Sequence, residues 1–202
     1  MSAHNSALRC VLPAGLARGH RGNPAAVLRV EVLYGQPVLL SCLSALVLTC
    51  QELDTLNRFY KINIQRLQKL YRGTPDPVVY FLGGSLPLSA LLDLRSLSLL
   101  GMISQLGPSH ILHKIGCSIL SSSKPSRHLW FSKIRVTCRK YTLPDPLVLL
   151  SNPPPKLQLK KLMKSKVIQF WENKLRQAAA HCPPCSISSL SSILSVSPTQ
   201  YG

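Results

Sequence analysis

The chain has 202 residues, and 24 Lys and Arg against 7 Asp and Glu give it a formal net charge of +17 at pH 7. Hydrophobic residues make up 46% of the chain, which is too large a share for a protein that is disordered throughout. The surplus of cations favours an anionic partner, either nucleic acid or an anionic membrane.

The first quarter of the chain predicts a flexible segment followed by two short helices. Residues 1–23 are polar and rich in glycine, so we expect them to be flexible. The Asn-Pro pair at 23–24 is an N-cap and first-turn signal, which predicts a helix over 25–35. Pro37 should interrupt it, and a second buried helix should follow over 38–48.

The same region leaves a membrane-inserted segment open as an alternative. Residues 32–50 carry no charge, and neither do residues 96–113. Gln36, Pro37 and several hydroxyl groups make the first stretch more polar than most membrane spans, so we expect buried helices there instead.

A basic amphipathic helix is predicted over 51–71. Thr49 followed by Glu52 is a capping-box signal for its start. At about 100° per residue, one side of this helix is apolar and the other is cationic. The cations that share one side are candidate phosphate contacts: Arg58, Lys61, Lys69 and Arg72. A row of charges that only faces water is the alternative.

The middle of the chain predicts one turn and several further helices. A turn is expected at 73–77, followed at 78–82 by a short segment that has strand character, with continued helical packing as the alternative. Helices are expected at 85–107, at 110–120, at 126–140 and after the Asp145-Pro146 pair, the last of them ended by the prolines at 153–155.

A second basic helix is predicted over 156–181, before a Ser-rich tail at 182–202 that we expect to be disordered. Its apolar face should comprise Val167, Ile168, Trp171, Leu175 and Ala178. Its first half carries the further candidate nucleic-acid contacts Lys160, Lys161 and Lys164, beside Lys156 and Lys166. Such a cluster is compatible with phosphate binding, with nuclear import or with a solvated helix end.

Cysteine and histidine give weak metal signals, and we expect no metal or cofactor. His110, His113 and Cys117 would share one helical face, but no fourth ligand can be named. Cys182 and Cys185 form a lone CxxC with no second pair. The seven cysteines are odd in number and no secretory signal is evident, so we expect reduced thiols in an intracellular protein.

A series of short motifs occurs in one order along residues 7–180. They are AGL at 14–16, NP at 23–24, PVLL at 37–40, FYK at 59–61, LQKL at 67–70, RGTP at 72–75, VYFL at 79–82, GSLP at 84–87, LSLLGMI at 97–103, WF at 130–131, YTLPDP at 141–146, KSKV at 164–167 and FW at 170–171. In this order the chain resembles the region after the polymerase palm in non-LTR retrotransposon endonuclease–reverse transcriptases.

That resemblance implies a truncated, thumb-like fragment without the catalytic centre. Polymerases of this family hold two metal ions with clustered palm carboxylates, including a Tyr-x-Asp-Asp motif. Two-metal transfer needs such a cluster, whereas no two of the seven acidic residues here are adjacent. We therefore expect no enzymatic activity and no catalytic residues.

Together these patterns predict a mainly α protein made of small helical bundles. The expected divisions are a flexible segment (1–23), a thumb-like helical region (24–75), a helical extension (76–181) and the tail (182–202). The expected partner is RNA or an RNA–DNA duplex, bound through its phosphates without sequence preference. A small protein anchored in a membrane by residues 32–50 and a translated remnant with no selected activity are the alternatives.

Overall fold

The computed structural model of the chain describes residues 28–41, 43–122 and 130–180. Helices dominate this part of the chain and no strand occurs in it, so the prediction of a mainly α fold is confirmed. The elements are η1 (Glu31–Gly35), α3 (Gln36–Leu40), η2 (Leu43–Ala45), α4 (Cys50–Leu67), α5 (Asp76–Gly83), α6 (Leu88–Ser104), α7 (Ile111–Ser121), α8 (Trp130–Lys140), α9 (Pro146–Ser151) and α10 (Lys156–Ala180). The segments expected at 1–23 and 182–202 lie outside the described residues.

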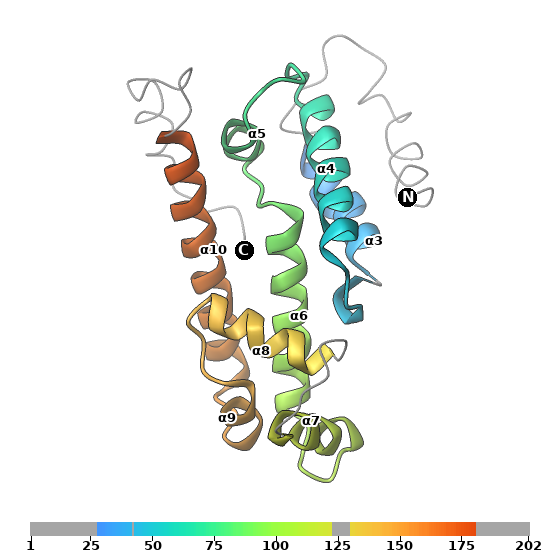
Figure 1. Cartoon of the computed structure of the whole chain (residues 1–202), viewed down its shortest axis with the longest axis vertical. Coiled ribbons are helices and arrows are strands. Elements are labelled where there is room, and N and C mark those ends of the chain that lie inside the picture. The colour runs from blue at the N-terminus through green and yellow to red at the C-terminus, as the bar shows by residue number, and fades with distance from the viewer. Residues whose placement is uncertain (1–27, 42, 123–129, 181–202) are drawn as a thin grey trace.

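Two long helices, α6 and α10, pack against each other and form the frame of the molecule (Figure 1). Helices α3, α4 and α5 lie toward one end of this pair, and α7, α8 and α9 lie toward the other. The division expected between 24–75 and 76–181 falls at the start of α5, and α4 packs against both α5 and α6 across it.

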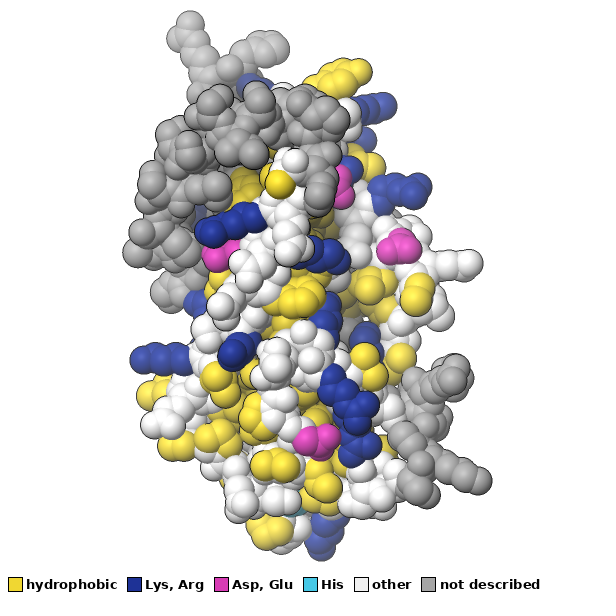
Figure 2. All heavy atoms as spheres, turned by 60° about the vertical axis from the view of Figure 1, so that its left-hand side comes forward, with side chains coloured by type: hydrophobic (Ala, Val, Ile, Leu, Met, Phe, Trp, Pro, Cys, Tyr) yellow, Lys and Arg dark blue, Asp and Glu magenta, His cyan; other side chains and the backbone are white. Residues whose placement is uncertain are grey.

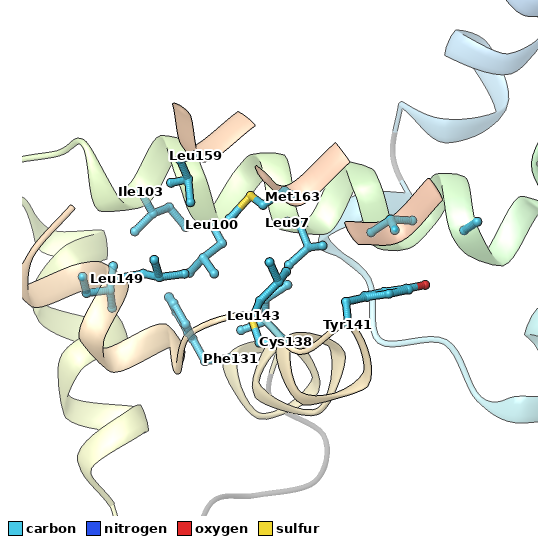
Figure 3. Packing of buried hydrophobic residues seen from close by; sticks show 14 of the residues in the cluster. Leu97, Leu100, Ile103, Phe131, Cys138, Tyr141, Leu143, Leu149, Leu159 and Met163 are labelled. Atoms are coloured by element: carbon cyan, nitrogen blue, oxygen red, sulfur yellow. The ribbon is translucent and has the colours of Figure 1, made fainter. Parts of the chain in front are cut away.

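Buried side chains form two clusters along this frame. The N-terminal cluster consists of Leu40, Tyr60, Ile64, Val79, Tyr80, Leu88, Leu92 and Leu175. The C-terminal cluster lies between α6, α8, α9 and α10, and its members include Leu97, Leu100, Ile103, Phe131, Cys138, Leu149, Leu159 and Met163 (Figure 3). Burial of apolar side chains of this size supplies most of the free energy that favours folding.

The first described helix continues through Pro37. Glu31–Gly35 form a π-helical turn, after which the next backbone N–H donates to the carbonyl of Glu31, five residues back. This turn shifts the hydrogen-bond register directly before the proline, so the helix accommodates a residue that has no N–H. The break expected at Pro37 is therefore wrong, and the helix expected over 38–48 ends at Leu40.

The capping box at the start of α4 is confirmed. The hydroxyl of Thr49 accepts a hydrogen bond from the N–H of Glu52 at 3.3 Å, and the Glu52 carboxylate accepts one from the N–H of Thr49 at 2.8 Å. The second of these bonds lowers the pKa of Glu52, because it stabilises the ionised carboxylate.

The end of α4 differs from the prediction. The helix stops at Leu67 because Lys69 adopts a left-handed conformation with φ of 56°. The N–H of Lys69 donates to the carbonyl of Arg66, and the N–H of Leu70 donates to the carbonyl of Gln65 at 2.9 Å. This pair of bonds is the Schellman ending of a helix, here made without glycine. The expected extension of the helix to residue 71 is wrong.

At 78–82 the strand character is wrong and the helical alternative is correct, because these residues belong to α5. Asp76 and Pro77 lie in the first turn of that helix, where a carboxylate complements the helix dipole and a missing N–H costs nothing. A short apolar run cannot by itself distinguish a strand from a buried helix. Gly84, with φ of 54°, ends α5.

The last three helices agree with the prediction in type and order. The Asp145 carboxylate accepts a hydrogen bond from the N–H of Leu147 at 2.9 Å and so caps α9. In α10 the buried residues recur every four positions from Leu159 to Ala179. Ala178, expected on the apolar face, is exposed, and Ala179 is buried in its place.

Within the described residues, no single helix has both the length and the apolar composition to cross a membrane. Helices α5 and α6 reach that length and apolar composition only when they are taken together, and the pair is bent by 58°.

Candidate nucleic-acid interface

The cations of α4 do not form the uninterrupted row that the sequence predicts. Arg58 is exposed, but the ammonium of Lys61 pairs with the carboxylate of Asp76 at 2.5 Å. Gln65, which lies between Lys61 and Lys69 in the sequence, is buried and donates to the carbonyl oxygens of Arg72 and Thr74. The side of α4 that carries Lys61 therefore packs against the turn before α5 and does not face solvent along its length.

The other two cations of this predicted row lie outside the helix. Lys69 is the left-handed residue that ends α4, and Arg72 lies in the turn that follows, both of them exposed. Arg66, exposed in the last turn of α4, was not among the predicted contacts. Cations at this end complement the negative pole of the helix dipole. The prediction of four cations on one helical face is wrong.

The three lysines predicted in α10 do lie together. Lys160 and Lys164 are four residues apart on an unbroken helix, and Lys161 is three residues from Lys164, so their side chains are surface neighbours. Lys160 and Lys161 are exposed and Lys164 is half-buried. Lys156 extends the row by one more turn. In the described part of the chain, no acidic side chain pairs with Lys160 or Lys161.

A buried polar network holds α10 in place. The Trp171 indole N–H donates to the Tyr141 hydroxyl at 2.9 Å, and that hydroxyl donates to the Asp93 carboxylate at 2.6 Å. Lys140 donates to the same carboxylate at 2.7 Å and lies 4.8 to 5.6 Å from the ring centroids of Tyr141, Phe170 and Trp171. Burial, together with the charge of Asp93, raises the pKa of Tyr141 strongly, so this hydroxyl stays a donor.

Sequence reasoning did not single out Lys140, although this residue donates to Asp93 and lies over three aromatic rings. Its partners come from α6, from the residue after α8, and from α10, which are far apart in the chain. In the sequence, Lys140 adjoins Tyr141 and Phe170 adjoins Trp171. Neither pair shows that the three rings would surround one ammonium group. Ammonium groups over aromatic faces are attracted by the ring quadrupole.

Most acidic side chains are engaged in the fold. Glu52 caps α4, Asp76 pairs with Lys61, and Asp93 belongs to the network around Lys140. Asp145 caps α9 and lies 3.5 Å from Arg135. Their negative charges are therefore compensated locally and do little to offset the cations exposed elsewhere.

Positive charge is concentrated in one part of the chain. Residues 94–171 contain thirteen Lys and Arg but one acidic residue, Asp145. Figure 2 shows the side of the molecule that carries α10, where Lys and Arg side chains are spread along the whole length and acidic ones are sparse. This part of the surface has the charge that binding to phosphates requires.

The weak metal signal at His110, His113 and Cys117 does not become a site. His110 has an extended backbone and caps α7, with its ring nitrogen accepting from the N–H of Leu112. His113 contacts the carbonyl oxygen of Leu150 and lies 3.7 Å from the Cys117 sulfur. No group of three His, Cys, Asp or Glu among the described residues could hold a metal ion. The CxxC at 182–185 lies outside them.

Comparison of the chain with family models, with curated proteins and with solved structures found no match in any of the three.

Proposed function

We propose that this chain binds RNA or an RNA–DNA duplex through backbone phosphates, without sequence preference and without catalysing a reaction. The first half of α10 is the main contact in this proposal, with Lys160, Lys161 and Lys164 as the phosphate ligands. The resemblance to the post-palm region of non-LTR reverse transcriptases suggests the same partner, and we propose that the chain is a fragment of such a protein.

One observation carries the proposal: Lys160, Lys161 and Lys164 are neighbours on one surface of α10, and in the described part of the chain no acidic side chain pairs with the exposed Lys160 or Lys161. Lys156 extends this row into the first turn, which contains no acidic residue. The positive pole of the helix dipole disfavours a cation in that turn by a few tenths of a kcal/mol to about 1 kcal/mol. A phosphate ligand would remove that repulsion and would compensate the lysines that follow.

The test compares two triple variants of the full chain that lose the same charge. The first is Lys160→Gln with Lys161→Gln and Lys164→Gln, and the control is Arg58→Gln with Lys69→Gln and Arg72→Gln. Affinity for a labelled RNA–DNA duplex is measured at several salt concentrations. For the α10 variant, the slope of log affinity against log salt should shrink by about two to three units, because each lysine neutralises one phosphate.

The control variant should keep most of the slope, and the loss in the α10 variant should be similar for every duplex sequence. An equal loss in both variants would show that the overall charge of +17 binds the duplex and would exclude α10 as a site. Absence of salt-dependent binding in the unmodified chain would reject the function itself. Primer extension with Mg²⁺ by the unmodified chain would reject the non-catalytic part.

A further inference from the structure

Helix α7 exposes several apolar side chains to solvent, although another side of the helix is packed against the rest of the molecule. Its inner side is packed, with Gly116 and Leu120 buried. Its outer side leaves Ile111 67% exposed, Leu112 44% exposed and Ile115 43% exposed. Because Ile111 and Ile115 are four residues apart, they lie next to each other on the helix surface. The helix is therefore apolar on two sides, and only one of them is covered.

The inner side is held so closely that α7 cannot turn to bury the outer residues. A Cβ added to Gly116 would lie 2.9 Å from the ring of Phe131 in α8, which leaves no room for a larger residue. The ring of His113 contacts the carbonyl oxygen of Leu150 in α9 at 3.1 Å. Ile111 and Ile115 thus stay on the outside of a fixed helix at one end of the molecule (Figure 1).

Most charges around this end are positive, and Asp145, which caps α9 beside α7, lies 3.5 Å from Arg135. Lys114 is exposed between the apolar residues of α7, and no acidic residue occurs between positions 94 and 144. The start of α10 lies at the same end, because Gln105, just after α6, donates to the carbonyl of Pro154 at 3.0 Å. There Leu157, 72% exposed, stands next to Lys156 and one turn before Lys160. Both helices thus present apolar residues beside lysines.

A surface that combines exposed apolar residues with lysines favours a partner that is both anionic and apolar. Nucleic acid would satisfy the lysines but would leave the isoleucines in water. A second copy of this end would bring like charges together. An anionic bilayer offers negative headgroups with acyl chains below them, and a projecting apolar tip can enter that layer without a preformed groove. We propose that the α7 end of the molecule docks reversibly on anionic lipid surfaces.

The test uses the full chain in vesicle flotation, with vesicles of phosphatidylcholine alone or mixed with phosphatidylserine. Ile111→Ser with Ile115→Ser is compared with Tyr71→Ser and Leu82→Ser, a pair of exposed apolar residues elsewhere on the molecule. The α7 pair should lower partitioning onto the anionic vesicles about tenfold, because apolar area is no longer buried. Lys114→Gln should lower it about fivefold. The control pair should have little effect.

Equal binding by both double variants would overturn the proposal, since the lipid would then respond only to net charge. Equal binding to vesicles without phosphatidylserine would also overturn it. Helix content by circular dichroism should match between the variants, because every changed residue is exposed. Duplex affinity of the α7 variant should equal that of the unmodified chain, so failure of this proposal and failure of the nucleic-acid proposal can be told apart.

Discussion

Helices α4 and α10 are both amphipathic and basic, yet their cations have different roles. Lys61 of α4 pairs with Asp76, and Arg66 lies at the helix C-terminus, where a cation stabilises the dipole. In α10 the lysines gather in the first half, where the dipole gives no such benefit. The position of a charge along its helix, together with its acidic partners, therefore distinguishes cations that stabilise the fold from cations whose position gives the helix no such benefit.

Among the acidic residues, the largest expected effect on stability comes from Glu31, which is buried near the N-terminal end of the described residues. Burial raises the pKa of Glu31 to about 7 from an ordinary value of 4.5. Its protonated form is favoured in the folded state, so the chain should lose stability as pH rises from about 4.5 to about 7. Above about pH 7, ionisation of Glu31 should lower the free energy of unfolding by about 3 kcal/mol.

Glu31→Gln should remove this penalty, because the amide is nearly isosteric and cannot ionise. Urea unfolding at about pH 5 and about pH 8 should show a variant that is more stable at the higher pH and less dependent on pH. Unchanged pH dependence in the variant would mean that another group titrates. Glu172→Gln, at a half-buried site on α10, is the matched control.

A smaller effect on stability should distinguish the Lys140–Asp93 pair from the Lys61–Asp76 pair. Asp93 is mostly buried, with 16% of its side chain exposed, and accepts hydrogen bonds from Lys140 and Tyr141. Asp93→Asn should destabilise the fold by about 2 kcal/mol, because hydrogen bonds to a charged group are lost in a poorly solvated site. Asp76, 59% exposed, should lose less than about 1 kcal/mol on the same change. Similar losses in both variants, measured by urea unfolding, would contradict this ranking.

The smallest effect concerns the left-handed residues that end α4 and α8. Lys69 and Thr142, with φ of 56° and 53°, occupy a conformation that costs roughly 1 kcal/mol for a residue with a side chain. Lys69→Gly and Thr142→Gly should therefore each stabilise the protein by up to about 1 kcal/mol, seen as a higher Tm. Thr142 should gain more because it is β-branched. A lower Tm in either variant would mean that its side chain makes contacts that outweigh the backbone cost.

Features set by neighbouring residues could be predicted from the sequence, and those set by distant contacts could not. The capping box of Thr49 and the cap at Asp145 were found because each uses residues within one turn. The end of α4 was missed because a lysine, not a glycine, adopts the left-handed conformation there. Gly73, four residues later, gave a misleading stop signal.

The residues of the candidate site also divide into those that local spacing predicts and those that depend on distant contacts. Lys160, Lys161 and Lys164 could be grouped from spacing alone, because one helix carries all three. The pairing of Lys61 with Asp76 and the burial of Gln65 depend on how the chain folds back after α4, and no local pattern reports that. The π-helical turn before Pro37 was missed for a similar reason, since a proline usually marks a helix boundary.

One consequence of α10 concerns the order in which the fold can be completed during synthesis. Leu175, near the end of this helix, belongs to the N-terminal cluster, whose other buried members lie between positions 40 and 92. A growing chain exposes residues 40–92 before α10 is made, and their cluster cannot be completed until α10 leaves the ribosome. Residues 40–92 are synthesised before residue 175, so their buried cluster stays incomplete until Leu175 has emerged.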